Sequence, residues 1–447
     1  MKIEAPILKK ELLDGMVSFR FTIGVILMIV SAAICIYVRF HEYDQRLNSY
    51  HLTLATQQAF LEKYAHANRL RAVFQAHVPP RRMSLLLREL TPNLDLMQTL
   101  EDDPADLFPP SFDFQWLVGI LGSLLAIVLA YDVISGERER GTLALISSNS
   151  VSLTRIVIEK WLGGNLLTVF PLVLVVLLTS IYIHLNPRVN WVVEDWVAWL
   201  LIAIIYAIYL SVFFTLGLLI SCSMRRSSVS ILTLSLLWVL AVVFIPSLGL
   251  PLSKVMKRIP PPEVVAQQLR TIEQERESAV RARINELIRS GLSAEQARWS
   301  SEVISKPYWT KAMRLRQDYE RQLADQRRLA RWISAFSPTF CMIQATSELA
   351  GIGASSVDHL TRSIDEWNRL VDDLVQRKIQ SLQVANPSFG PDDFIDVSDI
   401  PRFIYREQPL SSRWDAAVTY IGLLLLYETG LLVLALLLSR RIDVRPD

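Results

Sequence analysis

The chain lacks the features that ordinarily mark an ATPase, a hydrolase or a nucleic-acid-binding protein. Its 447 residues carry a formal net charge of only +2, so there is no basic footprint for nucleic acid. The phosphate-binding pattern G-x-x-x-x-G-K-[ST] is missing, and so are HExxH, GxSxG and GxGxxG. No spacing of serine, histidine and aspartate singles out a catalytic triad. We therefore expect no enzymatic site on this polypeptide.

Cysteine is scarce as well, with three residues in the whole chain, Cys35, Cys222 and Cys341. They are scattered, and the first two fall in apolar stretches, so a disulfide framework is not expected. No Cys/His spacing typical of a metal site appears. The sequence predicts neither a metal nor a cofactor on this chain.

Apolar residues, in contrast, make up 51% of the chain and lie in blocks. A spanning helix needs about 20 mostly apolar residues to cross a hydrocarbon core about 30 Å thick. The sequence therefore predicts an all-α integral membrane protein with six transmembrane helices. These are Phe19–Val38, Phe114–Ile134, Leu162–Leu185, Trp196–Ile220, Val229–Leu250 and Ala416–Leu438.

The basic residues that flank the apolar blocks predict the orientation. Those gathered on one side are Lys9, Lys10, Arg20, Arg138, Arg140, Arg155, Lys160, Arg225, Arg226, Arg440, Arg441 and Arg445. Short loops rich in Lys and Arg stay inside, so both termini are expected to be cytoplasmic, in a bacterial inner membrane. The predicted organisation is 1–38 (interface helix and first span), 39–113 (first extracytoplasmic insertion), 114–250 (spans two to five), 251–415 (second, helical insertion) and 416–447 (last span and tail).

The N-terminus, Ala5 to Ser18, reads as a helix lying in the membrane interface. The predicted lipid-facing residues are Ile7, Leu8, Leu12 and Leu13, and the water-facing ones are Lys9, Lys10 and Glu11. The alternative is a simple upstream extension of the first span.

Both insertions are predicted to be mainly helical. The expected helices are Phe40 to about His77, Glu263–Ser290, Ser293 to about Phe336 with a bend at Pro307, and Ser356–Ala385, whereas Leu94–Pro110 reads as a loop. Between two of them, Ser334 to Gly353 is less charged than its surroundings. It forms either an apolar face that dips into the outer leaflet near the spans or a buried seam of the external helices.

The most informative stretch, Tyr131 to Leu162, reads YDVISGERERGTLALISSNSVSLTRIVIEKWL and joins two predicted spans. Its residue order resembles the cytoplasmic coupling segment of ABC-2-type transporter permeases. The matching positions are Asp132, Ser135, Gly136, Glu137, Glu139, Gly141, Thr142, Leu143, Ser150, Ser152, Arg155, Ile156 and Lys160. We call residues 135–161 the coupling segment. Without the resemblance it would read as an ordinary charged loop.

The resemblance extends to the six-span topology and to Pro79–Leu90, which is similar to a proline-led segment in the first insertion of one ABC-2 subgroup. It implies a permease that pairs with a second permease copy or a homologue. It also implies a separate cytoplasmic ABC ATPase that carries the ATP and Mg²⁺. The implied coupling residues are Ser135, Gly136, Glu137, Arg138, Glu139, Arg140, Gly141, Thr142, Leu143, Arg155 and Lys160. Glu137, Arg138, Glu139 and Arg140 are the candidate contacts to the ATPase.

Few polar groups interrupt the spans. Glu428 falls near the middle of the sixth, where an ionisable side chain marks either a functional site or a structural hydrogen bond to a neighbouring helix. Asp132 lies at the inner end of the second span and suits coupling or capping. Tyr206 and Tyr209 lie on a weakly polar stripe of the fourth, which suits either a dimer seam or helix packing.

Two functions fit these observations. In the first, the chain is an exporter whose apolar spans suit an amphipathic, lipid-linked or peptide-like substrate. In the second, it is a mechanotransmission subunit, which relays ATP-driven motion to an extracytoplasmic protein while nothing crosses. The large external portion favours the second, and membrane lipid is a partner in both.

Overall fold

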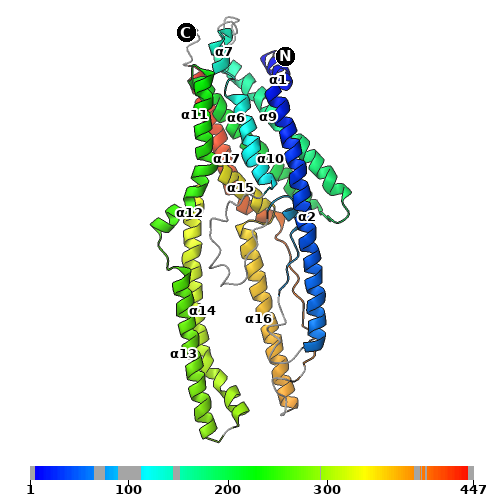
Figure 1. The fold of residues 1–447 in the computed structure, drawn as a ribbon, viewed down its shortest axis with the longest axis vertical. Helices are drawn as coiled ribbons and strands as arrows, with labels where there is room; N and C mark the ends of the chain where they lie inside the picture. The colour runs from blue at the N-terminus through cyan, green and yellow to red at the C-terminus, as the bar shows by residue number, and fades with distance from the viewer. Residues whose placement is uncertain are drawn as a thin grey trace. The chain divides into compact units, whose positions relative to one another are not determined.

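A computed structural model describes residues 6–64, 76–88, 112–143, 152–291, 293–386, 393, 395–397 and 400–440. Every regular element among them is a helix (Figure 1). The chain forms two compact units. The first comprises Met1–Leu90, Pro110–Val242 and Pro338–Asp447, and the second comprises Thr91–Pro109 and Val243–Ser337.

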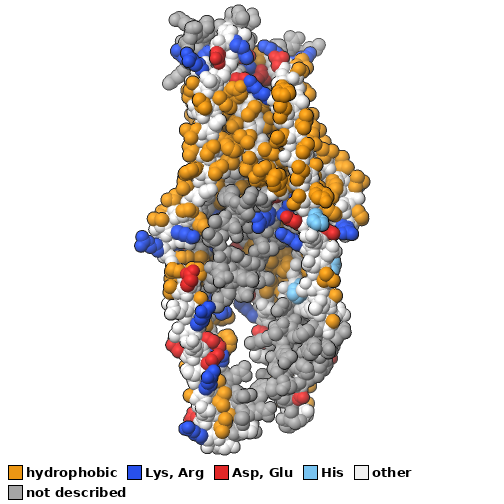
Figure 2. Space-filling model, in the orientation of Figure 1, with side chains coloured by type: hydrophobic (Ala, Val, Ile, Leu, Met, Phe, Trp, Pro, Cys, Tyr) orange, Lys and Arg blue, Asp and Glu red, His pale blue; other side chains and the backbone are white. Residues whose placement is uncertain are grey.

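Six helical stretches are long and apolar enough to cross a membrane, as the sequence predicts. They are Phe19–Ala59, Phe114–Glu139, Leu153–Leu185, Val193–Ser223, Ser227–Met256 and Leu410–Ser439. On the face drawn in Figure 2, hydrophobic side chains gather over the helices of the first unit that contribute to these spans. The chain is therefore a multi-pass membrane protein.

The N-terminal helix α1 (Pro6–Val17) is separate from the first span, α2 (Phe19–Tyr64). Ser18 breaks the two apart, because its hydroxyl donates to the Gly15 carbonyl (2.7 Å) and accepts the Phe21 N–H (3.3 Å). A separate N-terminal helix is therefore present, and its place in the membrane interface stays a prediction. Helix α2 continues for 46 residues, about 70 Å at 1.5 Å per residue, which is far more than a bilayer requires.

The second span is built from α5 (Phe114–Trp116), the π-helical segment η3 (Leu117–Gly122), α6 (Ser123–Ala130) and α7 (Ser135–Glu139). The third is α9 (Leu153–Leu185), the fourth is α10 (Val193–Ser223), and the sixth is α17 (Leu410–Ser439). The fifth consists of α11 (Ser227–Val239), the π-helical segment η4 (Leu240–Phe244) and α12 (Ile245–Met256).

Helix α10 is the central element of the first unit and packs against α6, α9 and α17. Small residues allow this close approach, as is common between membrane helices. A Cβ atom on Gly164 of α9 would lie 1.8 Å from the ring of Phe214, and one on Gly217 would lie 2.4 Å from Ala130 Cβ. These two positions fix how closely the second and third spans approach the fourth.

A short helix outside the six spans, α15 (Pro338–Leu349), also belongs to this bundle. It packs against α10 and α17, and Cys341, Met342 and Ala345 are fully buried. The amide nitrogen of Gln115, at the start of the second span, donates to the Ile343 carbonyl (3.1 Å) and to the hydroxyls of Thr346 and Ser347 (2.9 and 2.8 Å). Helix α15 therefore matches neither alternative as stated, because it packs against the spans while Met342 and Leu349, which the first alternative turned toward lipid, are buried in protein.

Helix α16 (Ala354–Ala385) follows and buries one face, in which Trp367 and Val371 pack against Ile400. In the second unit, α13 (Pro262–Arg289) and α14 (Ala294–Ser334, with Pro307 inside) form a hairpin around Val265, Leu269 and Tyr319. Helix α12 packs along α14. The helices predicted from residue 262 onward are therefore present, whereas their extracytoplasmic location stays a prediction. The predicted loop at 94–110 lies outside the described residues.

Candidate functional site

The start of the coupling segment is bound to the ends of several spans. The Ser221 hydroxyl, near the end of α10, accepts the N–H groups of Ile134 (3.0 Å) and Ser135 (2.9 Å). Asp132 forms an ion pair with Arg20 of α2 at 2.9 Å. Polar side chains therefore satisfy the backbone where α6 ends and α7 begins.

Lys160 is the charged centre of this region. It lies on α9 with a side chain only 3% exposed, and its Nζ binds Glu11 of α1 (3.0 Å) and Glu137 of α7 (3.1 Å). Two carboxylates thus neutralise one buried ammonium, which is the condition for a charge to be tolerated in such a place. The prediction that Glu11 faces water is wrong, because the buried lysine draws this carboxylate inward.

The next two charged residues of the segment bind helix ends. Arg138 donates to the carbonyls of Met224 (3.1 Å) and Cys222 (3.3 Å) at the C-terminus of α10. The Glu139 carboxylate accepts the N–H (3.2 Å) and the hydroxyl (2.7 Å) of Ser227, the first residue of α11. Both contacts match the helix dipole, with a cation at a C-terminus and an anion at an N-terminus.

Helix α7 ends just after Glu139. Gly141 has φ of +73°, a left-handed conformation that ends α7 and that a β-carbon would disfavour. The side chains of Glu139 and Arg140 are exposed, whereas Leu143 is buried. The Thr142 hydroxyl donates to the Glu137 carbonyl at 3.2 Å. The predicted surface helix from Thr142 and the matching position Ser150 fall mostly on residues 144–151, outside the described residues.

The remaining matching positions lie in α7 and at the start of α9. Gly136, in α7, packs against Asp132, and a Cβ atom on Gly136 would lie 3.2 Å from the Cβ atom of Asp132. Ser152 caps α9 by accepting the Arg155 N–H at 3.3 Å. Arg155 forms an ion pair with Glu159 (2.8 Å), which in turn accepts the Leu8 N–H of α1 at 3.4 Å. Of the four predicted ATPase contacts, the structure turns Glu137 and Arg138 inward and leaves Glu139 and Arg140 at the surface.

Within the spans, Glu428 of α17 is the centre of a hydrogen-bonded cluster. Its Oε1 accepts from the hydroxyls of Ser211 (2.8 Å) and Thr215 (2.9 Å) on α10 and from the indole nitrogen of Trp161 (3.2 Å) on α9. The Trp161 nitrogen also donates to the Thr215 hydroxyl at 2.8 Å. The cluster therefore joins the third, fourth and sixth spans through uncharged donors.

Tyr206 and Tyr209 lie in the core of the first unit. Both side chains are fully buried. The Tyr209 hydroxyl donates to the Gly119 carbonyl in the π-helical segment η3 (2.8 Å) and lies 3.0 Å from the Thr339 hydroxyl of α15. Tyr209 thereby joins the second and fourth spans to α15, which is the helix-packing role rather than an exposed seam.

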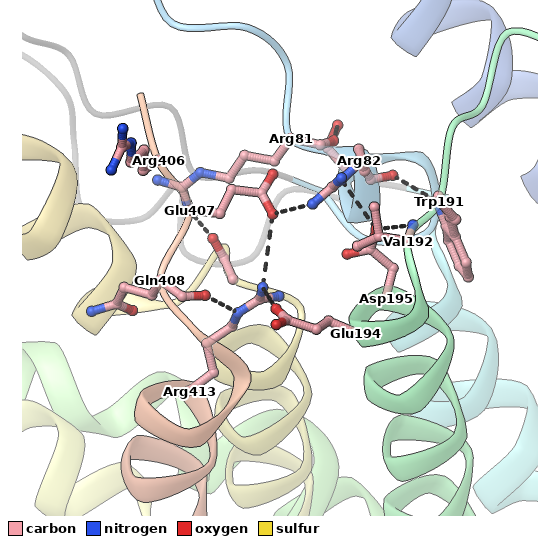
Figure 3. Close-up of polar contacts among 12 residues, drawn as sticks. Arg81, Arg82, Trp191, Val192, Glu194, Asp195, Arg406, Glu407, Gln408 and Arg413 are labelled. Carbon is pink, nitrogen blue, oxygen red and sulfur yellow. Dashed lines mark hydrogen bonds and ion pairs between the residues drawn. The ribbon is translucent and has the colours of Figure 1, made fainter. Parts of the chain in front are cut away.

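At the opposite ends of the spans lies a second charged cluster (Figure 3). We call it the outer arginine cluster, after the orientation that the sequence predicts. It consists of Arg81, Arg82, Glu194, Asp195, Glu407 and Arg413. Arg82 lies between Asp195 of α10 (3.0 Å) and Glu407 (3.1 Å). Asp195 is completely buried and also accepts the Val192 N–H at 3.0 Å, so it closes the first turn of α10.

Arg413, in the first turn of α17, is the largest fully buried side chain of the protein's described residues. Its guanidinium donates to the carbonyls of Gln408 (2.8 Å) and Leu349 (3.4 Å) and lies 3.8 Å from Glu407 and 3.9 Å from Glu194. Gly351 has φ of +71°, and a Cβ there would be 3.3 Å from the guanidinium. The turn after α15 is thus shaped around this arginine.

Arg81 and Arg39 extend the cluster into the first insertion. Arg81 donates to the carbonyls of Gly351 and Ser356. Arg39 of α2 donates to the carbonyls of Ser84 (2.6 Å) and Leu87 (2.8 Å). Asp113, which caps α5, lies nearby, and burial raises the pKa of its carboxyl even though the N–H groups of Trp116 and Arg88 bind it. Buried charged side chains therefore bind residues 76–88 to α2, to the turn after α15 and to the start of the second span.

Sequence reasoning missed the outer arginine cluster. Two features of the sequence point to it. Arg81 and Arg82 directly follow two prolines, and Arg413 is an isolated basic residue just before an apolar span. What the sequence cannot reveal is that residues more than 300 positions apart, such as Arg82 and Glu407, form a pair.

A sequence model of the family described as "ABC-2 family transporter protein" matches residues 5–443, nearly the whole chain. The chain belongs to the ABC-2 transporter family. No curated protein matches it significantly. As an ABC-2 protein it is a transmembrane component, and membership of this family implies in general an ABC ATPase as partner. The resemblance of the coupling segment to ABC-2 permeases is consistent with that assignment.

Proposed function

We propose that this ABC-2 protein is the permease subunit of an ABC transporter. It pairs with a second permease and couples ATP hydrolysis by a separate cytoplasmic ATPase to export of an amphipathic, lipid-linked or peptide-like substrate. The positive residues around the coupling segment support a cytoplasmic position for it and for both termini. The observation that carries the proposal is the set of contacts made by α7 and its flanks.

Those contacts reach five helices. Asp132 binds α2, Glu137 binds Lys160 of α9 and through it α1, Arg138 binds the end of α10, and Glu139 binds the start of α11. A partner that pushes on the exposed Arg140 side of this short helix moves the inner ends of five helices together. A loosely attached loop would absorb the same push.

The apolar character of the spans supports the proposed substrate class. The helices that face outward from the bundle, α2, α11 and α17, expose mainly hydrocarbon, and the polar groups at the centre of the bundle are bound to one another around Glu428. A permeant that slides along such surfaces is amphipathic, because a free ion would leave its hydration shell without replacement.

A mechanotransmission role is the second candidate, and the outer arginine cluster favours it. Arg82 and Arg413 attach residues 76–88 and 400–408 to the ends of α10 and α17. Motion of these two spans therefore carries with it the external parts of the first unit, including α16, whose first turn Arg81 and Gln408 bind. In this role the output is movement outside the membrane and no substrate crosses.

Reconstitution distinguishes the two roles. The partner ATPase is first identified by co-purification, and the two proteins are then placed together in lipid vesicles. ATP turnover and the flux of a fluorescent amphipathic peptide or lipid are measured in the same vesicles. ATP-dependent flux supports export. Turnover that responds to an external protein without flux supports the relay. Accessibility labelling that places Arg140 outside the cell, or ATP hydrolysis by the purified chain alone, would overturn both.

A further inference from the structure

The second unit carries an apolar and basic surface where α12 and α14 run side by side. Trp332 on α14 and Phe336 in the turn after it are 56% and 74% exposed, and Val255 and Met256 at the end of α12 are 71% and 68% exposed. Beside them lie five exposed or half-exposed basic residues, Lys254, Arg258, Arg327, Arg328 and Arg331. Large exposed aromatic side chains next to a basic band are typical of a membrane interface.

The contacts between the two helices set their relative height. The Ser334 hydroxyl donates to the Pro246 carbonyl (2.9 Å), and the Gln326 amide donates to the Lys257 carbonyl (2.7 Å). The helices are thus antiparallel, and the end of α14 lies beside the apolar part of α12. Helix α12 is itself the last part of the fifth candidate span, Ser227–Met256. The end of α14 therefore lies at the depth of a membrane-spanning helix.

Both helices carry basic residues at about the same height. With Pro246 opposite Ser334 and Lys257 opposite Gln326, Lys254 lies opposite the Arg327–Arg328 pair, whereas Trp332 lies opposite Gly249 and Leu250. Because the helices are antiparallel, two separate stretches of sequence place cations at the same level. Toward Pro246 and Ser334 neither helix carries a charged residue, whereas at the level of Lys254 and Arg328 cations alternate with apolar side chains. Such a mixed band at the edge of hydrocarbon matches the level of phospholipid headgroups.

We propose that the end of α14 is inserted into the bilayer leaflet at the far end of the fifth span from Arg225 and Arg226. There, Trp332 and Phe336 contact acyl chains, and Lys254, Arg258, Arg327, Arg328 and Arg331 bind anionic phospholipid headgroups. The acid nearest this band, Asp325, is neutralised by Lys257 at 2.6 Å and therefore does not cancel it. The hairpin of α13 and α14 is thereby anchored to the leaflet at its base.

Single cysteines test the insertion. Native Cys35, Cys222 and Cys341 are buried, so an environment-sensitive fluorophore attaches selectively to W332C or to the control W309C. Trp309 is as exposed as Trp332 (59% against 56%) and lies on the same helix, about 35 Å away along its axis. In nanodiscs with spin-labelled acyl chains, we expect at least twofold stronger quenching at position 332. Equal quenching at both positions would overturn the insertion.

Lipid charge is tested separately, by comparing melting temperatures in phosphatidylcholine nanodiscs with and without phosphatidylglycerol. The wild-type protein should melt at a higher temperature in the anionic discs. The variant R327Q/R328Q/R331Q should lose at least half of that increase, whereas R314Q/R316Q, exposed on the same helix above the plane, should keep it. An increase that the triple variant retains, or no increase in the wild type, would overturn the headgroup assignment. Neither measurement depends on the ATPase partner, so failure here is distinct from failure of the proposed transport function.

Discussion

Lys160 Nζ and Glu137 Oε1 lie 3.1 Å apart and join the third span to the coupling segment through a nearly dry ion pair. The same ammonium binds Glu11 at 3.0 Å, so the N-terminal helix shares the contact. A lysine in this position is not a surface charge awaiting a partner protein. It is the shared partner through which α1, α7 and α9 are connected.

Replacing Lys160 by Met should therefore destabilise the fold. Removal of one partner from a buried pair leaves uncompensated charge and costs about 3–5 kcal/mol, and we expect about 3 kcal/mol here because Glu11 keeps some exposure. Thermal unfolding in detergent measures the loss. The triple variant K160M/E137Q/E11Q should regain most of it, and R155M, whose arginine is 56% exposed in its pair with Glu159, should lose under about 1 kcal/mol. A K160M protein as stable as wild type would contradict this account.

Arg140 provides the cleaner test of the ATPase contact. Charge reversal at Glu137 would also break the Lys160 pair, and reversal at Glu139 would remove the cap on Ser227, worth about 1 kcal/mol. Arg140 is exposed, so Arg140→Glu should leave the melting temperature within about 1 °C while it lowers recovery of the ATPase in a pull-down several-fold. Glu139→Gln is the matched control, because it weakens the cap without reversing the charge. Unchanged recovery with Arg140→Glu would count against the contact.

The six candidate spans and the helices between residues 262 and 385 could be predicted from the sequence because each depends on local pattern. Apolar blocks of about 20 residues predict spans wherever they occur, and the 3.6-residue period of Glu263–Ser290 predicts α13 within one residue at either end. The helix break at Ser18 also follows from local chemistry. None of these features requires knowledge of what the segment contacts.

Polar contacts between residues far apart in the chain could not be predicted from the sequence. The sequence marks Glu428 as unusual, but it does not reveal that Ser211, Thr215 and Trp161 surround it. Likewise, an amphipathic pattern turns Glu11 toward water, and only the position of Lys160 on another helix reverses that expectation. The packing of whole helices determines which buried polar groups meet, and a single sequence does not specify that packing.

Glu428→Gln should leave the protein folded. The carboxyl accepts three hydrogen bonds from uncharged donors, and an amide oxygen at the same place accepts them equally well. We expect a stability change below about 1 kcal/mol. Glu428→Leu removes the shared acceptor from three buried donors and should cost about 2–3 kcal/mol. Heating in detergent followed by size-exclusion chromatography ranks the two variants. Severe loss of folded Glu428→Gln protein would reveal an essential ion pair instead.

Arg413→Met tests whether the outer arginine cluster connects the spans to the external helices. The change removes the donor to the Gln408 and Leu349 carbonyls and leaves Glu407 with Arg82 alone, so the turn around Gly351 loses its support. We expect a loss of about 3 kcal/mol. Arg413→Lys should lose less, because an ammonium keeps the charge but does not reproduce the planar fork that reaches both carbonyls.

The same pair of variants separates a connecting role from a purely stabilising one. Below its melting temperature, Arg413→Met should bind the ATPase normally at Arg140, yet ATP turnover should lose its response to whatever engages the external helices. Hydrogen exchange at the start of α16 should rise in parallel, because Gln408 and Arg81 hold that turn from the same cluster. If exchange at α16 stays at the wild-type level while stability falls, Arg413 supports only its own span and the mechanical route through the cluster is excluded.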